Sequence, residues 1–274
     1  MQTQENNLLV VDALNLAFRW KHSGARDFAE DYLRTVQSLQ RSYKAKWVVI
    51  ASDQGSSQYR KELYPLYKQN RKDKVELQTE EERVAFELFF EDYMATLEHI
   101  KQNTDYLLLR FQGVEADDIA AYITQLKLPA NHIWLMSSDK DWDLLVSNRA
   151  SRFSYVTRKE VTLENWHTHY DFQPEDYISI KCLTGDAGDN VPGVPGIGPK
   201  RAEALVKQFG STWDIIAHMP VQGKYEYLKA LNTFGAEQLI LNYKLMDLQT
   251  HCQEALGLEN CETINITLKE YINE

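Results

Sequence analysis

Nine acidic residues lie directly after short apolar runs or beside turn-rich segments, where they could bind metal ions. The runs LLVVD, WVVIASD and IWLMSSD each end on an aspartate, and the other acids lie in GVEADD, SSDKDWD and GDAGDN. The nine candidates are Asp12, Asp53, Glu115, Asp117, Asp118, Asp139, Asp141, Asp186 and Asp189. Carboxylate oxygens suit Mg²⁺ or Mn²⁺, whereas the His and Cys ligands that favour zinc are missing from these positions. If folding gathers the acids, they predict a site for hard divalent cations.

Each acid taken singly also has an ordinary structural explanation. Glu115, Asp117 and Asp118 would be favourable in the first turn of a helix because of the helix dipole, and Asp139 or Asp141 could cap a turn. A gathered set is different, because like charges within several ångströms destabilise a fold unless cations lie among them. Two such cations, about 3.5 to 4 Å apart, can activate water and stabilise a leaving oxygen in a phosphoryl displacement. The combined pattern therefore points to phosphodiester hydrolysis.

Three aspartate-terminated runs predict the elements that would position these acids. The apolar runs indicate buried strands, and the segments of about residues 27–43 and 115–127 indicate helices between them. Strands that alternate with helices predict a parallel α/β sheet. Ligands of such sheets lie beyond the carboxyl ends of the strands. Asp12, Asp53 and Asp139 are therefore expected to converge on one edge of the sheet.

A long insertion, about residues 57–100, contains a basic and tyrosine-rich stretch. From Arg60 to Lys74 it has six bases and two acids, a local charge of +4 in a chain of −10. Lys68 and Arg71 are three residues apart and would share a helix face, from which they could stabilise charge on a scissile phosphate. Tyr67 is the candidate for stacking on an exposed base, and Lys72 is a further cation for a DNA backbone. The alternative is a solvated cationic helix, followed by a second helix that Thr79 and Glu82 would cap.

The stretch GDAGDNVPGVPGIGPKR, residues 185–201, joins two of the acids to a pair of cations. Gly193, Gly196 and Gly198 would permit close, left-handed turns that aim backbone N–H groups outward. Lys200 and Arg201 follow Pro199, a residue suited to the first position of a helix. Cations there oppose the helix dipole, but a bound phosphate would satisfy both the dipole and the free backbone N–H groups. The alternative is an incidental helix start.

Composition limits the classes of protein that fit. A chain of 274 residues with 43% hydrophobic content can bury a full core. Its net charge of −10 argues against a protein that coats nucleic acid nonspecifically, unless its acidic and basic residues are segregated. No apolar run approaches the roughly 20 residues that span a bilayer, and the first residues lack a signal pattern, so we expect a cytoplasmic protein that does not bind membranes. Cys182, Cys252 and Cys261 show no CxxC spacing and are interpreted as reduced thiols.

Six motifs closely resemble, in kind and order, the flap endonuclease or 5′-nuclease family, especially its stand-alone bacteriophage members. They are VDALNL, SDQG, YKQNR, GVEADD, SSDKDWD and GDAGDNVPGVPGIGPKRA, within residues 8–210. The resemblance implies a PIN-like α/β fold, with a mainly parallel central sheet flanked by helices, a helical arch and a helix-three-turn-helix DNA-binding module. It implies a nuclease core over residues 1–172 that includes the arch at about 57–100, a helix-three-turn-helix region over 173–250, and a tail over 251–274 that packs on the core.

The resemblance also implies roles for the candidate residues. One metal ion would lie near Asp12, Asp53, Glu115, Asp117 and Asp118, and a second near Asp139, Asp141, Asp186 and Asp189. Lys68 and Arg71 align with the active-site residues of the arch, and the glycine hairpin would hold the downstream duplex backbone, with K⁺ bound there. The implied activity is two-metal hydrolysis of 5′-flap or 5′-tailed DNA near the junction, with 5′-3′ exonuclease activity, by a monomer in phage DNA replication. Replication proteins are candidate partners, in the host cytoplasm.

Two other functional classes are alternatives to a nuclease. A noncatalytic, structure-specific DNA-binding protein would use the acids only in folding, and EDTA would leave its function intact. A phosphatase or nucleotide-hydrolysing enzyme fits poorly, because VDALN lacks the second aspartate of an aspartyl-phosphatase. GVPGIGPKR is also not a P-loop, since Lys200 precedes Arg201 rather than Ser or Thr.

Overall fold

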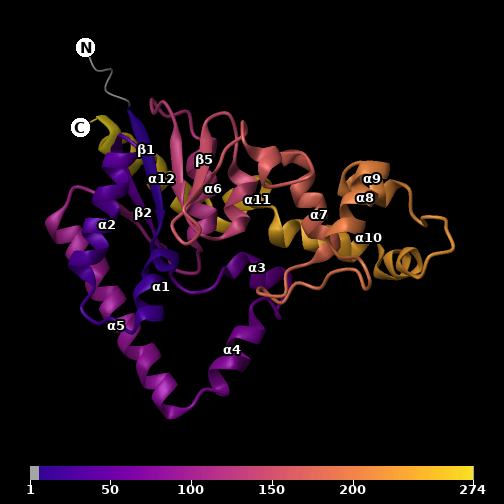
Figure 1. The fold of residues 1–274 in the computed structure, drawn as a ribbon, viewed down its shortest axis with the longest axis horizontal. Helices are drawn as coiled ribbons and strands as arrows, with labels where there is room; N and C mark the ends of the chain where they lie inside the picture. Colours follow the sequence, from indigo (N-terminus) through magenta and orange to yellow (C-terminus); the bar gives the residue numbers. More distant parts are fainter. Residues whose placement is uncertain (1–5, 274) are drawn as a thin grey trace. The chain divides into compact units, whose positions relative to one another are not determined.

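A computed structural model describes residues 6–273, which form two compact units (Figure 1). The first unit contains residues 6–58, 77–163 and 248–273. The second unit contains residues 59–76 and 164–247. The expected arch insertion, about 57–100, is thus divided between the units after residue 76.

The first unit is built on a six-stranded sheet in the order β3-β2-β1-β4-β5-β6. The strands are β1 (Asn7–Asp12), β2 (Ala45–Ala51), β3 (Leu107–Leu109), β4 (Ile133–Met136), β5 (Ala150–Ser154) and β6 (Lys159–Val161). All neighbouring pairs are parallel except β5 and β6. The three predicted strands and the mainly parallel α/β sheet are confirmed, whereas β3, β5 and β6 were not predicted individually.

The order of the strands creates a topological switch point between β1 and β4. From β1 the chain proceeds outward to β2 and then β3, and it returns to the other side of β1 to form β4. The connection from β1 to β2 and the connection from β4 to β5 therefore lead away in opposite directions from two adjacent strands. Such a reversal opens a crevice for ligands at the carboxyl ends of the two strands. Asp12 is the last residue of β1, and β4 leads directly into the segment Ser137–Ser138–Asp139.

Helices of the first unit cover this sheet. They are α1 (Ala13–Ser23), α2 (Ala29–Ser42), α5 (Glu80–Asn103), α6 (Ala116–Gln125), α11 (Leu248–Leu256), α12 (Leu258–Asn273) and the 3-10 helix η1 (Lys140–Leu145). Helices α2 and α6 coincide with the two predicted helices. Thr79 and Glu82 form the predicted capping box of α5, because each side chain accepts a backbone N–H of the other residue, at 3.2 and 3.0 Å.

The C-terminal helices pack within the first unit. The Gln125 side chain at the end of α6 donates a hydrogen bond of 2.5 Å to the carbonyl of Gln249 on α11. The hydroxyl of Tyr271 on α12 accepts from the backbone N–H of Val48 in β2 at 3.0 Å. Helix α11 also packs along α6, so the C-terminal segment supports the helix that begins with Ala116.

The second unit is helical and has its own core. Its elements are α3 (Gln58–Leu63), α4 (Gln69–Glu76), η2 (Trp166–Thr168), η3 (Pro174–Asp176), α7 (Tyr177–Thr184), α8 (Pro199–Phe209), α9 (Thr212–Ala217) and α10 (Glu226–Met246). The predicted helix start at Pro199 is confirmed. The 3-10 helix η3 begins at Pro174, and Ser211 caps α9. Leu183 and Leu231 are fully buried in the core between α7, α8 and α10. None of the helices among residues 6–273 is long and apolar enough to cross a membrane.

Candidate active site

The carboxylate of Asp12 joins the ends of the two central strands. Asp12 caps α1, and its Oδ1 accepts a hydrogen bond from the backbone N–H of Asn15 at 3.2 Å. Its Oδ2 accepts from the hydroxyl of Ser137, immediately after β4, at 2.7 Å. The side chain of Asn15 accepts the backbone N–H of Ser138 at 3.0 Å. Asn15 and Ser137 therefore position this acid at the switch point, although neither was a predicted site residue.

The strand-end acids, Asp12, Asp53 and Asp139, interact electrostatically. The pKa of Asp12 is raised to about 8, first by burial, then by the charge of Asp53 and to a smaller extent by that of Asp139. The hydrogen bonds from Ser137 and Asn15 lower this pKa but do not compensate. No cation among the described residues figures among these causes. A buried carboxylate with acidic neighbours has the all-oxygen chemistry that fits a hard divalent cation.

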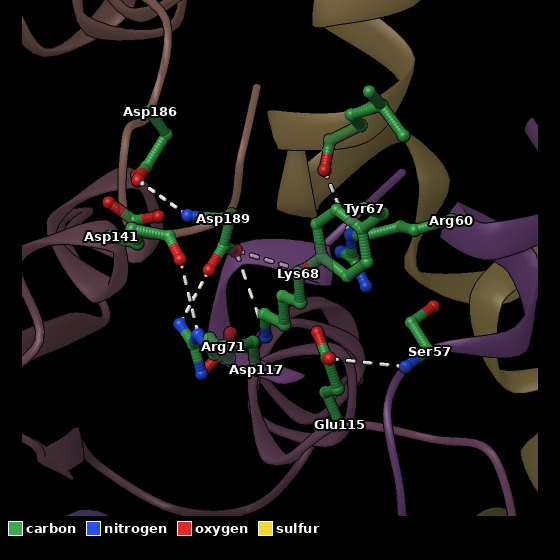
Figure 2. Close-up of polar contacts among 12 residues, drawn as sticks. Ser57, Arg60, Tyr67, Lys68, Arg71, Glu115, Asp117, Asp141, Asp186 and Asp189 are labelled. Atoms are coloured by element: carbon green, nitrogen blue, oxygen red, sulfur yellow. Dashed lines mark hydrogen bonds and ion pairs between the residues drawn. The ribbon is translucent and has the colours of Figure 1, made fainter. Parts of the chain in front are cut away.

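The start of α6 holds a second group of acids. Asp53 Oδ1 accepts the backbone N–H of Ala116 at 2.6 Å. Glu115 is buried, and its Oε1 accepts the backbone N–H of Ser57 at 3.1 Å, as Figure 2 shows. These bonds tie the segment that follows β2 to the start of α6, so they bring Asp53 and Glu115 to the same end of that helix.

The other predicted acids of the first unit have mixed surroundings. Asp117 accepts the indole N–H of Trp142 at 2.6 Å, and Asp139 caps η1 by accepting the backbone N–H of Asp141 at 2.9 Å. Asp118 is fully buried. Burial and then the charge of Asp118 raise the pKa of the Cys252 thiol on α11 to about 12, so Asp118 lies on the α11 side of its helix. Over the described range 6–273, no three His, Cys, Asp or Glu side chains are close enough together to hold an ion.

Asp189 in the second unit is held by three side chains of the segment that includes α4 (Figure 2). The Tyr67 hydroxyl donates to its Oδ2 at 2.9 Å, and the Lys68 Nζ lies 3.7 Å from the same oxygen. Arg71 Nη2 donates to Oδ1 at 2.5 Å. The predicted cations and one predicted metal ligand are therefore in direct contact within this unit.

Two predictions about this segment need correction. Lys68 does not share a helix face with Arg71, because α4 begins at Gln69 and Lys68 has a left-handed φ of 56°. Its backbone N–H donates instead to the carbonyl of Asp189 at 2.9 Å. The prediction that Tyr67 stacks on an exposed base is also wrong for this structure, because its ring is only 3% exposed and lies in a small apolar cluster with Cys182 and Leu245.

Backbone contacts fix the turn that carries Lys68. The Asn70 side chain donates to the carbonyl of Ala187 at 2.7 Å, and the Asn190 side chain donates to the carbonyl of Leu66 at 2.8 Å. Asn70 lies in the motif YKQNR, but the hydrogen-bond partner of its side chain lies more than a hundred positions away in the chain. No short sequence pattern could therefore identify this contact.

Asp186 is paired with a lysine that the sequence analysis missed. Lys181 Nζ lies 3.3 Å from Asp186 Oδ2, and the backbone N–H of Asp189 donates to Asp186 Oδ1 at 3.1 Å. Burial raises the pKa of Asp186, but the charge of Lys181 and the hydrogen bonds outweigh it, so the pKa lies below its ordinary value. Asp186 is therefore ionised at neutral pH.

The glycine hairpin contains glycines with different roles. A Cβ on Gly193 would lie 2.0 Å from the carbonyl oxygen of Thr184, so only glycine fits there. Gly196 has a left-handed φ of 78°. Gly198 has an ordinary φ of −94° and open space around it, so the prediction that all three glycines adopt left-handed turns holds only for Gly196.

The predicted phosphate-binding cations lie at the exposed start of α8. Lys200 and Arg201 are both exposed, as is Lys72 on α4. Arg201 Nη1 donates to the carbonyl of Gly196 at 2.5 Å, which ties this guanidinium to the hairpin.

A parallel sheet with carboxylates at its switch point, in a chain that also has a helical unit with a glycine hairpin, is typical of metal-dependent nucleases of the α/β class. Residues 7–171 match the 5′-3′ exonuclease N-terminal resolvase-like domain, and residues 172–268 match the 5′-3′ exonuclease C-terminal SAM fold. The chain therefore belongs to the 5′-3′ exonuclease and flap endonuclease family.

Known relatives support this assignment over nearly the whole chain. The flap endonuclease of Escherichia phage T5 is 40% identical over 97% of this chain and 91% of its own. A crystal structure of the phage T5 flap endonuclease in a pseudo-enzyme-product complex with DNA and metal ions matches with a TM-score of 0.92 at 39% identity, covering 98% of this chain and 100% of that one. A second T5 structure, crystallised with metal ions, has a TM-score of 0.90 at 39% identity, covering 97% and 99% of the two chains.

Proposed function

We propose that this enzyme hydrolyses phosphodiesters of 5′-flap or 5′-tailed DNA near the junction of single and double strand, and that it also degrades DNA from 5′ ends. The observation that carries the proposal is the buried carboxylate of Asp12 at the switch point of β1 and β4, where the charges of Asp53 and Asp139 raise its pKa and no cation among the described residues figures among the causes. The T5 relative, which was crystallised with DNA and metal ions, supports the same activity.

The proposed cofactors are two Mg²⁺ or Mn²⁺ ions. In the first unit, Asp12, Asp53, Glu115 and Asp117 offer the oxygens for such ions, and Asp118, Asp139, Asp141, Asp186 and Asp189 stay predicted ligands, direct or through water. Bound divalent ions would supply activation of water and neutralisation of charge on the phosphate. The protein's own contribution is to hold Asp12 at the strand end through Ser137 and Asn15.

Lys68 and Arg71 would act electrostatically on the phosphate that is cut. Lys68 lies on the turn before α4 and Arg71 lies in α4, a segment that the side-chain hydrogen bonds of Asn70 and Asn190 hold in place. Positioned cations stabilise the developing negative charge without a reorganisation cost. The exposed hairpin cations, Lys200 and Arg201, would bind the duplex backbone without reading base edges, and K⁺ at the hairpin would add a further positive charge. Binding should therefore depend on DNA shape. The likeness to the phage T5 flap endonuclease further supports a role of the monomer in phage DNA replication, alone or with replication proteins.

A labelled 5′-flap substrate tests this function. Pure protein with Mg²⁺ should cut near the junction, and EDTA should abolish cutting without preventing DNA binding. Lys68→Ala should lower the cleavage rate constant by about 100-fold or more, and Asp139→Asn should do the same. The matched controls are Lys74→Ala on α4 and Asp171→Asn, both at exposed positions, which should cut at the normal rate. Undiminished cutting by the first two variants would contradict the assigned roles.

A further inference from the structure

The loop before α10 carries an aromatic pair that the proposed function does not use. Tyr225 is 56% exposed, and its ring is stacked on that of Tyr227 at a centroid distance of 5.5 Å and an interplanar angle of 14°. Figure 1 shows the connection between α9 and α10, in orange, extending beyond the helices α8 and α9 of the same unit. Tyr225 therefore presents one face of its ring to its stacked neighbour and leaves much of its surface to solvent.

This aromatic pair is connected to the glycine hairpin. The guanidinium carbon of Arg201 lies 5.0 Å from the centroid of the Tyr227 ring, and the same guanidinium donates to the carbonyl of Gly196. Arg201, Tyr227 and Tyr225 thus form a layered series that leads from the hairpin to the exposed loop. Aromatic rings that already contact a cation and a parallel ring can also bind a further planar π system favourably.

The loop is held rigidly enough to present Tyr225 in one position. Asn232 on α10 makes two hydrogen bonds to Val221, accepting its backbone N–H at 2.8 Å and donating to its carbonyl at 2.9 Å. The carbonyl of Tyr225 accepts the backbone N–H of Leu228 at 3.1 Å and so begins α10. A preorganised ring loses little conformational entropy when it binds a partner.

We propose that Tyr225 is a stacking platform for an unpaired or terminal nucleobase of the DNA whose duplex backbone the glycine hairpin holds. The inference rests on the proposed function, since the hairpin must bind DNA for the platform to meet it. The charges nearby favour nucleic acid over a protein partner. Lys200, Arg201 and Lys224 are exposed cations, while Lys229 is neutralised by Glu226 at 2.7 Å. Stacking on a tyrosine tolerates any base, so the platform would add affinity without sequence preference.

Binding of flap DNA, measured by fluorescence anisotropy in EDTA to prevent cutting, tests the platform. Tyr225→Ala should weaken binding by about 5- to 100-fold, and Tyr225→Phe should bind as the unmodified protein does. The slope of log K against log salt should stay unchanged in Tyr225→Ala, whereas Lys200→Ala should reduce it by about 0.9 because a phosphate contact is lost. Trp213→Ala, which removes an aromatic ring 47% exposed on α9, is the matched control and should bind normally.

Abasic substitutions identify the base that is stacked. An abasic site keeps the phosphate charge and removes only the base. A scan along the DNA should therefore find one position at which an abasic site weakens binding by the unmodified protein but does not change binding by Tyr225→Ala. Normal binding by Tyr225→Ala, or equal losses for Phe and Ala, would overturn the platform while the protein still cuts flaps. Failure of the unmodified protein to bind and cut flap DNA would instead overturn the proposed function.

Discussion

Asp12→Asn should stabilise the metal-free protein, and more so as the pH rises. Asparagine has nearly the shape of aspartate, its oxygen can still accept from Asn15, and its amide can donate to the Ser137 oxygen. The substitution therefore removes the charge that burial and Asp53 make unfavourable. The chain would lose a proposed metal ligand but gain stability when no metal is bound.

The size of this effect follows from the pKa of Asp12, which is raised from 3.8 to about 8. A carboxyl whose pKa is higher in the folded state stabilises the fold while it is protonated, and this contribution is lost as the pH rises from about 4 to about 8. Each tenfold change in proton affinity is worth about 1.4 kcal/mol. Between about pH 5.5 and about pH 7.5, the advantage of Asp12→Asn over the unmodified protein should grow by about 2 to 3 kcal/mol.

Urea unfolding of both proteins in EDTA at these two pH values measures the difference directly. Titrating groups that do not interact with Asp12 contribute equally to both chains, so the change in the difference reports Asp12 together with its coupling to Asp53 and Asp139. Saturating Mg²⁺ should reverse the order, because a cation that binds only the folded state stabilises the unmodified protein more than the variant. A pH-independent difference in EDTA, or an equal gain from Mg²⁺ in both proteins, would refute the electrostatic account of this site.

Two further predictions concern the second unit. Gly193→Ala should lower the free energy of unfolding by about 3 kcal/mol or more, because its Cβ would collide with the Thr184 carbonyl. Gly198→Ala lies in open space and should lower it by less than about 1 kcal/mol. Thermal unfolding measures both variants, and equal losses of stability would contradict the close contact at Gly193. Tyr67→Phe removes one hydrogen bond to Asp189 and should lower the free energy of unfolding by about 1 kcal/mol, because the buried ring stays in place. Urea unfolding measures this loss, and unchanged stability would contradict the contribution of the hydrogen bond.

Part of the site could be predicted because it depends on local patterns. The apolar runs that end on Asp12, Asp53 and Asp139 identified the strands, and the parallel topology then implied their convergence. The cap of α5 at Thr79 and the start of α8 at Pro199 were equally readable, because they involve residues only three or four positions apart.

The burial of Tyr67 and the pairing of Lys68 and Arg71 with Asp189 could not be predicted in this way. These contacts join residues about 120 positions apart in the chain, and the identity of such partners is not encoded in any short pattern. Lys68 also adopts a left-handed backbone conformation, which is incompatible with the helix that we predicted to contain both Lys68 and Arg71.

The sequence by itself determined the class of sheet, the starts of several helices and the chemical type of the acids, since strands, caps and ligand preference depend on neighbouring residues. Only the tertiary structure decided that the pKa of Asp12 is raised to about 8 and that the Tyr67 ring is covered. The physical reason is that burial and charge interactions depend on which distant segments surround a side chain, and that arrangement exists only once the chain has folded.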